Sequence, residues 1–319
     1  MIRRIPPKMI AIGVVTKDRP AMLARLLASF VEMDKPADVQ LAFVVIENAD
    51  TASLGAQVAQ FEAAISHKVL YDIEPEPGIP FARNAVLERA LTMGADILTF
   101  VDDDERVDQG WLVALVQGLW DRDLDLVGGP LRIEAETPVQ TFWQSAVLGF
   151  LQQKAGRNEA RRAERTANGT DGTQDAYTNN WALRLSFAAQ HGLRFDGNLR
   201  YTGGSDTAFS IALKAAGGRR GWVPDAVVYD RIPLHRLSLG YHYRRSRDQA
   251  RNGAILRKKP LWKAPFFMLA RFVEAAVLVL ISPIKGRVAL VRAVHNIALA
   301  DGRLRGALGF KSSLYAPKT

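Results

Sequence analysis

The stretch Ala95-Asp96-Ile97-Leu98-Thr99-Phe100-Val101-Asp102-Asp103-Asp104-Glu105 is the most informative part of the chain. Its apolar, partly β-branched section, Ile97–Val101, is typical of a strand buried on both faces. The strand runs directly into four carboxylates, which repel one another unless cations are close. Ligands of open α/β sheets bind at the carboxyl ends of strands. Alternation along an extended chain places Asp102 and Asp104 on one side, where both suit a hard divalent cation. The alternative interpretation is a solvated acidic turn before a helix that starts near Asp108.

Strands and helices alternate through the first half of the chain. Predicted strands cover Met9–Thr16, Leu41–Ile46, Lys68–Ile73, Asp96–Val101 and Asp125–Gly129, and predicted helices cover about 20–30, 51–65, 81–93 and 110–120. This alternation implies right-handed crossovers and an α/β fold with a Rossmann-like, mostly parallel sheet. The turn after the first strand has no glycine fingerprint and no Walker loop, so nicotinamide binding is not expected. The acidic cluster suggests a metal bridge to phosphate instead.

Composition sets the broad class. The 319 residues, 48% hydrophobic and 24% charged, suffice for one large or two modest domains with a sizeable core. With no cysteine, disulfides, thiolate catalysis and cysteine-ligated zinc are excluded, which is consistent with a reducing compartment. The basic N-terminus lacks the apolar core and the cleavage site of a signal peptide.

The segment between the two halves is less regular. Residues 139–152 have a helical pattern, whereas 153–175 contain almost no large apolar residue and are predicted to form a mobile loop. This loop is either an inert surface excursion or a lid over a nucleotide. Order resumes at 177–185. A helix is then predicted over 207–216, which Ser205 or Asp206 could simply cap.

The net charge of +9 arises from the C-terminal segment. Residues 1–230 contain 24 Lys and Arg against 30 Asp and Glu, whereas residues 231–319 contain 18 against 3. This basic segment is predicted to be helical from Leu237 onward. Within it, Ala264–Ile284 is apolar but is interrupted by Arg271 and Glu274.

A bilayer span needs roughly 20 predominantly apolar residues, so a helix lying in an anionic membrane surface fits this apolar stretch better than a span. The alternative is a helix packed on the rest of the protein or in a dimer interface. Nucleic-acid binding is not expected, because the interleaving of aromatic and basic residues is weak.

Several stretches, in order, resemble the family 2 glycosyltransferases, which have the GT-A fold, and the bacterial enzymes that build succinoglycan-type exopolysaccharides are most similar. The likeness covers about residues 9–255 and extends to 309. Two positions depart from the family pattern: Glu47 stands where Asp is usual, and Ser205 replaces the common Glu. The similar stretches are Ile12–Pro20 (first nucleotide-contacting loop), Val45–Asp50 (second loop), Gly78–Asn84 (glycine-to-Ala-Arg-Asn stretch), Asp102–Asp104 (Asp-x-Asp motif), Thr202–Asp206 (acceptor-side Gly-Glu-Asp motif) and Gly302–Gly306 (recurring chain end).

The resemblance implies a GT-A catalytic domain over residues 1–235, with a nucleotide-binding part at about 9–131 and an acceptor-binding part at about 132–235. A helical, basic, membrane-associated segment follows at 236–319. The implied metal ligands are Asp104 and Asp102, and the implied general base is Asp206. The implied nucleotide contacts are Thr16, Arg19, Glu47, Asn48, Gly78, Arg83, Asp102 and Asp103.

The resemblance also implies an inverting hexosyltransferase that uses Mg²⁺ or Mn²⁺ and a nucleotide sugar, expected to be UDP-linked. Its acceptor would be a saccharide or a lipid-linked sugar at the cytoplasmic face of the cell membrane. Two alternatives stay open: a nucleotidyltransferase on a related fold, which would release pyrophosphate, and a catalytically silent protein that docks on membranes. The sequence does not specify the sugar, the linkage or the oligomeric state.

Overall fold

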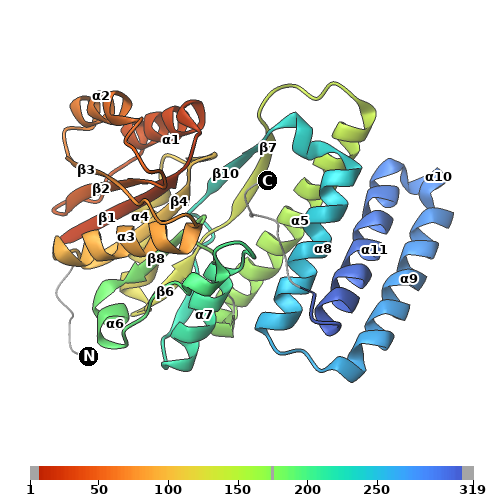
Figure 1. The fold of residues 1–319 in the computed structure, drawn as a ribbon. Coiled ribbons are helices and arrows are strands. Elements are labelled where there is room, and N and C mark those ends of the chain that lie inside the picture. The colour runs from red at the N-terminus through yellow and green to blue at the C-terminus, as the bar shows by residue number, and fades with distance from the viewer. Residues whose placement is uncertain (1–6, 174–175, 311–319) are drawn as a thin grey trace. The chain divides into compact units, whose positions relative to one another are not determined.

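The computed structural model describes residues 7–173 and 176–310 as two compact units (Figure 1). The sheet unit consists of the residues up to Arg132, Arg157–Arg200 and Ser205–Asp230. The helical unit consists of Ile133–Gly156, Tyr201–Gly204 and the residues from Arg231 onward.

A seven-stranded, mostly parallel sheet forms the centre of the sheet unit, as the sequence predicts. Its strand order is β3-β2-β1-β4-β8-β6-β9, and β8 is antiparallel to its neighbours β4 and β6. The chain passes from β1 outward to β2 and β3 and returns to β4 on the other side of β1, so a topological switch point lies between β1 and β4. The strands are β1 (Met9–Thr16), β2 (Gln40–Glu47), β3 (Lys68–Ile73), β4 (Ile97–Asp102), β6 (Leu126–Gly128), β8 (Trp181–Arg184) and β9 (Arg220–Trp222). A second sheet has the order β5-β10-β7, with β5 (Glu105–Val107), β10 (Val228–Ile232) and β7 (Leu131–Ala135).

Helices cover both faces of the large sheet because its strands are apolar on both sides. Along β1, Ile10 and Ile12 belong to one core cluster and Ala11 to the other, so the strand is buried on both faces as predicted. Helices α1 (Pro20–Glu32), α2 (Gly55–Ile65) and α4 (Trp111–Asp121) form the first cluster with the sheet, and α3 (Ile79–Thr92), α6 (Leu185–Gln190) and α7 (Ser205–Ala215) form the second (Figure 1). Two predicted starts shift: α2 begins at Gly55 and α7 at Ser205, so Ser205 and Asp206 lie within the first turn of α7.

The predicted mobile loop over 153–175 is wrong for most of its length. Helix α5 extends from Phe142 to Ala167, and a 3-10 turn follows at Asp171–Thr173. The residues from 153 onward are mainly Arg, Ala, Glu, Gln and Asn, several of which favour helix, and a scarcity of large apolar residues is also what a solvated helix shows. Arg162 stacks on the Trp222 ring at 4.4 Å. A lid over a nucleotide is therefore not supported; residues 174 and 175 lie outside the described residues.

The helical unit contains the basic C-terminal helices, as predicted. These are α8 (Leu239–Leu256), α9 (Ala264–Leu280), α10 (Ser282–Lys285) and α11 (Arg287–Ala307), with short 3-10 turns at Leu234–Leu237 and Leu261–Lys263. Helix α11 packs against both α8 and α9 (Figure 1). Close approach of α8 and α11 requires Gly302, because a Cβ there would lie 2.1 Å from the Arg247 carbonyl oxygen.

Two buried histidines lie in the interior of the helical unit. His242 on α8 and His295 on α11 have ring centroids 5.3 Å apart, and both contact the Phe150 ring. Burial, followed by the nearby charges of Lys154 and Arg245, lowers the pKa of His242 to about 4. Burial, followed by Lys154, His242, Arg271 and Arg292, lowers the pKa of His295 to about 3.

We therefore expect acid to destabilise the protein through this pair. An unfolded histidine takes up a proton near pH 6.5, but in the folded protein His242 does so only at about pH 4 and His295 at about pH 3, so the unfolded state binds more protons between these values. The loss amounts to about 2 kcal/mol per histidine between pH 6.5 and pH 5. Thermal unfolding followed by circular dichroism should show a melting temperature that falls less steeply with acid in a His242→Gln/His295→Asn variant. An equal slope in the two proteins would contradict this expectation.

Candidate active site

The carboxyl ends of β1, β2 and β4 bring Thr16, Glu47 and Asp102 to one edge of the sheet. In the parallel register Thr16 pairs with Glu47, and Val15 pairs with Asp102. The first and second predicted loops and the acidic cluster therefore start at one level, beside the switch point between β1 and β4. This is the place where ligands of open α/β sheets bind.

Asp103 links the first loop to the acidic cluster. Its buried carboxylate accepts hydrogen bonds from Thr16 Oγ1 at 2.8 Å and from Arg19 Nη1 at 2.9 Å. The same Arg19 nitrogen lies 3.5 Å from Asp104 Oδ2. Burial alone would lower the pKa of Arg19, but the charges of Asp103 and Asp104 raise it overall. Arg19 is therefore a fixed cation that holds two of the carboxylates.

Asp102 occupies a different environment. The strand ends at this residue and the chain turns at Asp103 and Asp104, so the alternation of an extended chain does not continue to Asp104. Asp102 Oδ1 lies 3.5 Å from Arg83 Nη2, and its side chain is 45% exposed. Although part of this side chain reaches solvent, the protein packed around it raises its pKa to about 6 by desolvation; Arg83 opposes this shift, and Asp104, Asp103 and Asp206 add to it.

Glu105 also belongs to the acidic cluster, although the sequence analysis assigned no role to this residue. Its buried carboxylate accepts hydrogen bonds from the Asp102 backbone N–H and from Asn179 Nδ2, both at 3.1 Å. Burial, with added repulsion from Asp102, Asp230 and Asp104, raises the pKa of Glu105 well above its ordinary value. The available signal in the sequence was its place directly after Asp102–Asp104 at the end of an apolar strand.

Glu47 and Asn48 stabilise the loops around the second strand end. Buried Glu47 accepts hydrogen bonds from Ser53 and from the Tyr71 hydroxyl, and these bonds outweigh burial and lower its pKa. Asn48 Nδ2 donates to the carbonyls of Glu74 and Glu76, and Asn48 Oδ1 accepts from the Gly78 N–H. These contacts give both side chains a structural role in addition to any contact with a ligand.

Gly78 is required by the backbone itself. Its φ is +134°, a conformation that other residues rarely adopt, and a Cβ would lie 2.8 Å from Arg200 Cβ. Arg200 in turn pairs with Glu76 at 2.6 Å. The glycine thus lets the loop before α3 close against the segment that carries Arg200.

Arg83 connects the acidic cluster to the start of α7. Its Nη1 donates to Ser205 Oγ at 3.0 Å, while Nη2 faces Asp102. Asp206, the next residue, accepts a 2.7 Å hydrogen bond from the Thr207 N–H and is close enough to Asp102 to help raise its pKa. The predicted donor-side and acceptor-side residues therefore form one electrostatic network, with Glu47, Asn48 and Gly78 in an adjoining loop network.

This arrangement of carboxylates suits a divalent cation whose remaining coordination positions are filled by a bound ligand. Among residues 7–173 and 176–310, no three His, Cys, Asp or Glu side chains form a ready-made metal site. Mg²⁺ is commonly held by one or two carboxylates together with substrate phosphates, so a complete protein cage is not required. Burial, with added repulsion from neighbouring carboxylates, raises the pKa values of Asp102 and Glu105, and a bound cation would oppose both effects.

The family is shown by comparison with known proteins. Residues 11–192 match the family described as Glycosyl transferase family 2. The chain belongs to this family. It is also 30% identical over 251 residues to the succinoglycan biosynthesis protein ExoM of Rhizobium meliloti (strain 1021), a match that covers 78% of this chain and 76% of that protein. The protein is therefore a glycosyltransferase, as the sequence predicts.

Solved structures confirm the predicted GT-A fold of this glycosyltransferase. The mannosyltransferase PcManGT from Pyrobaculum calidifontis, solved with GDP-Man and Mn²⁺, superposes with a TM-score of 0.60 at 17% identity, covering 93% of this chain and 87% of that one. Residues 1–349 of S. aureus TarS superpose with a TM-score of 0.51 at 15% identity, covering 93% and 91%. A longer TarS structure superposes with a TM-score of 0.51 at 14% identity over 92% of this chain. The chain spans about half, 55%, of that structure.

Proposed function

We propose that this glycosyltransferase transfers a hexose from a nucleotide sugar to a saccharide or lipid-linked acceptor, with inversion and with the help of Mg²⁺ or Mn²⁺. The observation that carries the proposal is the cluster of carboxylates at the switch point, where Asp103 and Asp104 pair with Arg19 and Asp102 pairs with Arg83. The similarity to ExoM supports a role in exopolysaccharide biosynthesis. GDP-Man and Mn²⁺ in the PcManGT structure support a nucleotide sugar and a metal.

On the donor side, we assign Asp104 as the direct metal ligand and Asp102 as a second ligand or a ribose contact. Asp103 supports them, because its oxygens already accept hydrogen bonds from Thr16 and Arg19. The metal, when bound, neutralises the charge that develops on the departing diphosphate. Thr16, Arg19, Glu47, Asn48, Gly78 and Arg83 complete the donor site. A UDP-linked donor is proposed, with TarS structures containing UDP and UDP-GlcNAc as support.

On the acceptor side, Asp206 is the proposed general base. It accepts the proton of the attacking hydroxyl, which is a poor nucleophile while protonated. A single displacement from the face opposite the diphosphate inverts the anomeric carbon. The hydrogen bond from Arg83 to Ser205 positions the start of α7, in a place where the family usually has a glutamate.

The proposed domain division is a catalytic domain over residues 1–235, with donor binding at about 9–131 and acceptor binding at about 132–235, and a membrane-associated segment at 236–319. We place the enzyme on the cytoplasmic face of the cell membrane.

A panel of nucleotide sugars tests this function. We expect slow, metal-dependent hydrolysis of one donor without acceptor, releasing the nucleoside diphosphate, because water can replace the acceptor hydroxyl. Release of pyrophosphate from a nucleoside triphosphate and a sugar phosphate would indicate a nucleotidyltransferase. Failure to bind any nucleotide with Mn²⁺ present would favour a silent binding protein.

A further inference from the structure

Helix α9 has an unusual distribution of charge and apolar surface. The two charged residues that interrupt its apolar sequence both face α11: Arg271 Nη1 lies 2.9 Å from Glu274 and 3.4 Å from Asn296, and Arg292 lies 3.2 Å from Glu274. Ala275 and Leu278 pack on the same side, in a cluster with residues of α11. The ion pairs of α9 are therefore on its packed face.

The opposite face of α9 is a continuous apolar stripe. Its residues recur every three or four positions and have 49–79% of their surface exposed. Apolar side chains so exposed and so regularly spaced mark an interaction surface. At about 1.5 Å per residue the stripe is roughly 25 Å long. The apolar stripe consists of Trp262, in the 3-10 turn before α9, and of Phe266, Leu269, Val273, Val277 and Leu280 on α9.

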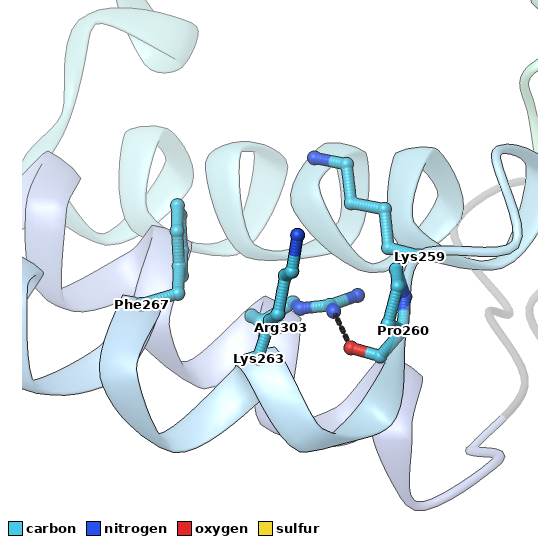
Figure 2. A pocket seen from close by; sticks show the side chains of 5 residues that line it. All are labelled: Lys259, Pro260, Lys263, Phe267 and Arg303. Carbon is cyan, nitrogen blue, oxygen red and sulfur yellow. Dashed lines mark hydrogen bonds between the residues drawn. The ribbon is translucent and has the colours of Figure 1, made fainter.

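A small pocket, lined largely by the carbon stems of basic residues, lies at the N-terminal end of this stripe (Figure 2). Its cavity of about 180 Å³ is lined by Lys259, Pro260, Lys263, Phe267 and Arg303, none of which carries a carboxylate. Arg303 is buried, and its Nη2 donates a 2.6 Å hydrogen bond to the Pro260 carbonyl. Partial burial, then Arg303 and Arg257, lower the pKa of Lys259. Lys263, which lines the pocket, directly precedes α9, whose start has no side-chain cap and carries the positive end of the helix dipole.

Cations are present at both ends of the apolar stripe. Lys258 and the pocket lysines precede α9, and the exposed Lys285 and Arg287 follow it. If two copies paired through this stripe, in either direction, cationic ends would meet cationic ends. Like charges in contact oppose such pairing. A surface that is apolar inside and anionic outside complements both the apolar stripe and the cations at its ends.

We propose that α9 lies in the interface of an anionic phospholipid bilayer, with the apolar stripe among the acyl chains and the exposed cations at its two ends on lipid headgroup phosphates. No helix in the described part of the chain is long and apolar enough to cross a bilayer. Only the face of α9 that carries the apolar stripe enters the bilayer surface. The opposite face, with its ion pairs, stays packed against α11. This docking rests on the membrane association proposed above for residues 236–319, but not on the proposed donor chemistry.

Flotation with vesicles tests the proposal on the full chain. We expect binding to phosphatidylglycerol-containing vesicles that exceeds binding to pure phosphatidylcholine about tenfold or more, as several cations near an anionic surface predict. Lys259→Glu/Lys263→Glu should lower binding to the phosphatidylglycerol-containing vesicles about tenfold or more. Phe266→Ser/Leu269→Ser, which removes apolar surface, should abolish stable binding. Lys68→Glu/Lys214→Glu, two exposed lysines of the sheet unit, changes the net charge equally and should bind as the native protein does.

Two further measurements distinguish a failure of membrane binding from a failure of the proposed donor chemistry. Donor hydrolysis in solution and melting temperature should be unchanged in all three variants, because the substituted side chains are exposed or partly exposed. Equal binding to both vesicle types, or no binding to either, overturns the proposal. So does a dimer by light scattering that Phe266→Ser/Leu269→Ser converts to monomer, which would make the stripe an interface between copies. Binding of inorganic phosphate in the pocket without vesicle binding overturns it as well.

Discussion

Sugar transfer should fall by about 10²–10⁴-fold in Asp206→Asn, the range that a positioned general base contributes. An amide cannot accept the proton of the attacking hydroxyl at neutral pH, whereas its size and shape match those of the carboxylate. The amide oxygen can keep the hydrogen bond from the Thr207 N–H, so the first turn of α7 should be retained. Donor and metal binding should persist, because none of the proposed donor contacts lies on α7.

Two measurements separate these effects: the rate of transfer to an acceptor, and the affinity for the nucleoside diphosphate with Mn²⁺ by calorimetry. The matched control is Asp196→Asn, because Asp196 Oδ1 also accepts a backbone N–H, from Asn198, at the start of a short 3-10 turn. We expect the control to keep full transfer. A transfer rate within about twofold of the native rate in Asp206→Asn would assign the base to another residue, because removal of a general base typically costs much more.

The central sheet and its site edge could be predicted because the signals are local. Continuous apolar runs identified β1, β2 and β4, and the residues after them had to meet at one edge because parallel strands share a direction. The acidic cluster was visible for the same reason, as four carboxylates directly behind a buried strand.

The parts that could not be predicted depend on contacts between distant residues. Asn48 donates hydrogen bonds to the carbonyls of Glu74 and Glu76, and Glu105 accepts one from Asn179. The sequence around Asn48 and Glu105 does not reveal these partners. The polar end of α5 had no apolar periodicity to detect, although its composition favoured helix. The orientation of Arg271 and Glu274 was also hidden, because an interruption in an apolar run does not show which face of a helix carries it.

Loss of Asp104 should remove the metal-dependent part of donor binding. In Asp104→Ala we expect nucleoside diphosphate affinity with Mn²⁺ to fall about 100-fold or more, because a metal stabilises phosphate charge by several kcal/mol. The acidic turn should stay folded, since Asp103 carries the short hydrogen bonds to Thr16 and Arg19. Affinity measured in chelator should change little, which distinguishes lost metal from lost shape.

Asp121→Ala, at the exposed end of α4, removes the same charge away from the site and should bind the nucleotide normally. The comparison with Asp102→Ala then assigns the ligand. If Asp104→Ala keeps Mn²⁺-dependent binding while Asp102→Ala loses it, the metal is held by the residue beside Arg83. Such an outcome is physically reasonable for a carboxylate whose pKa is already raised to about 6 by its surroundings. If both variants bind as the native protein does, the carboxylates at the end of β4 hold no metal, and the charge at the switch point must serve to orient Arg19 and Arg83.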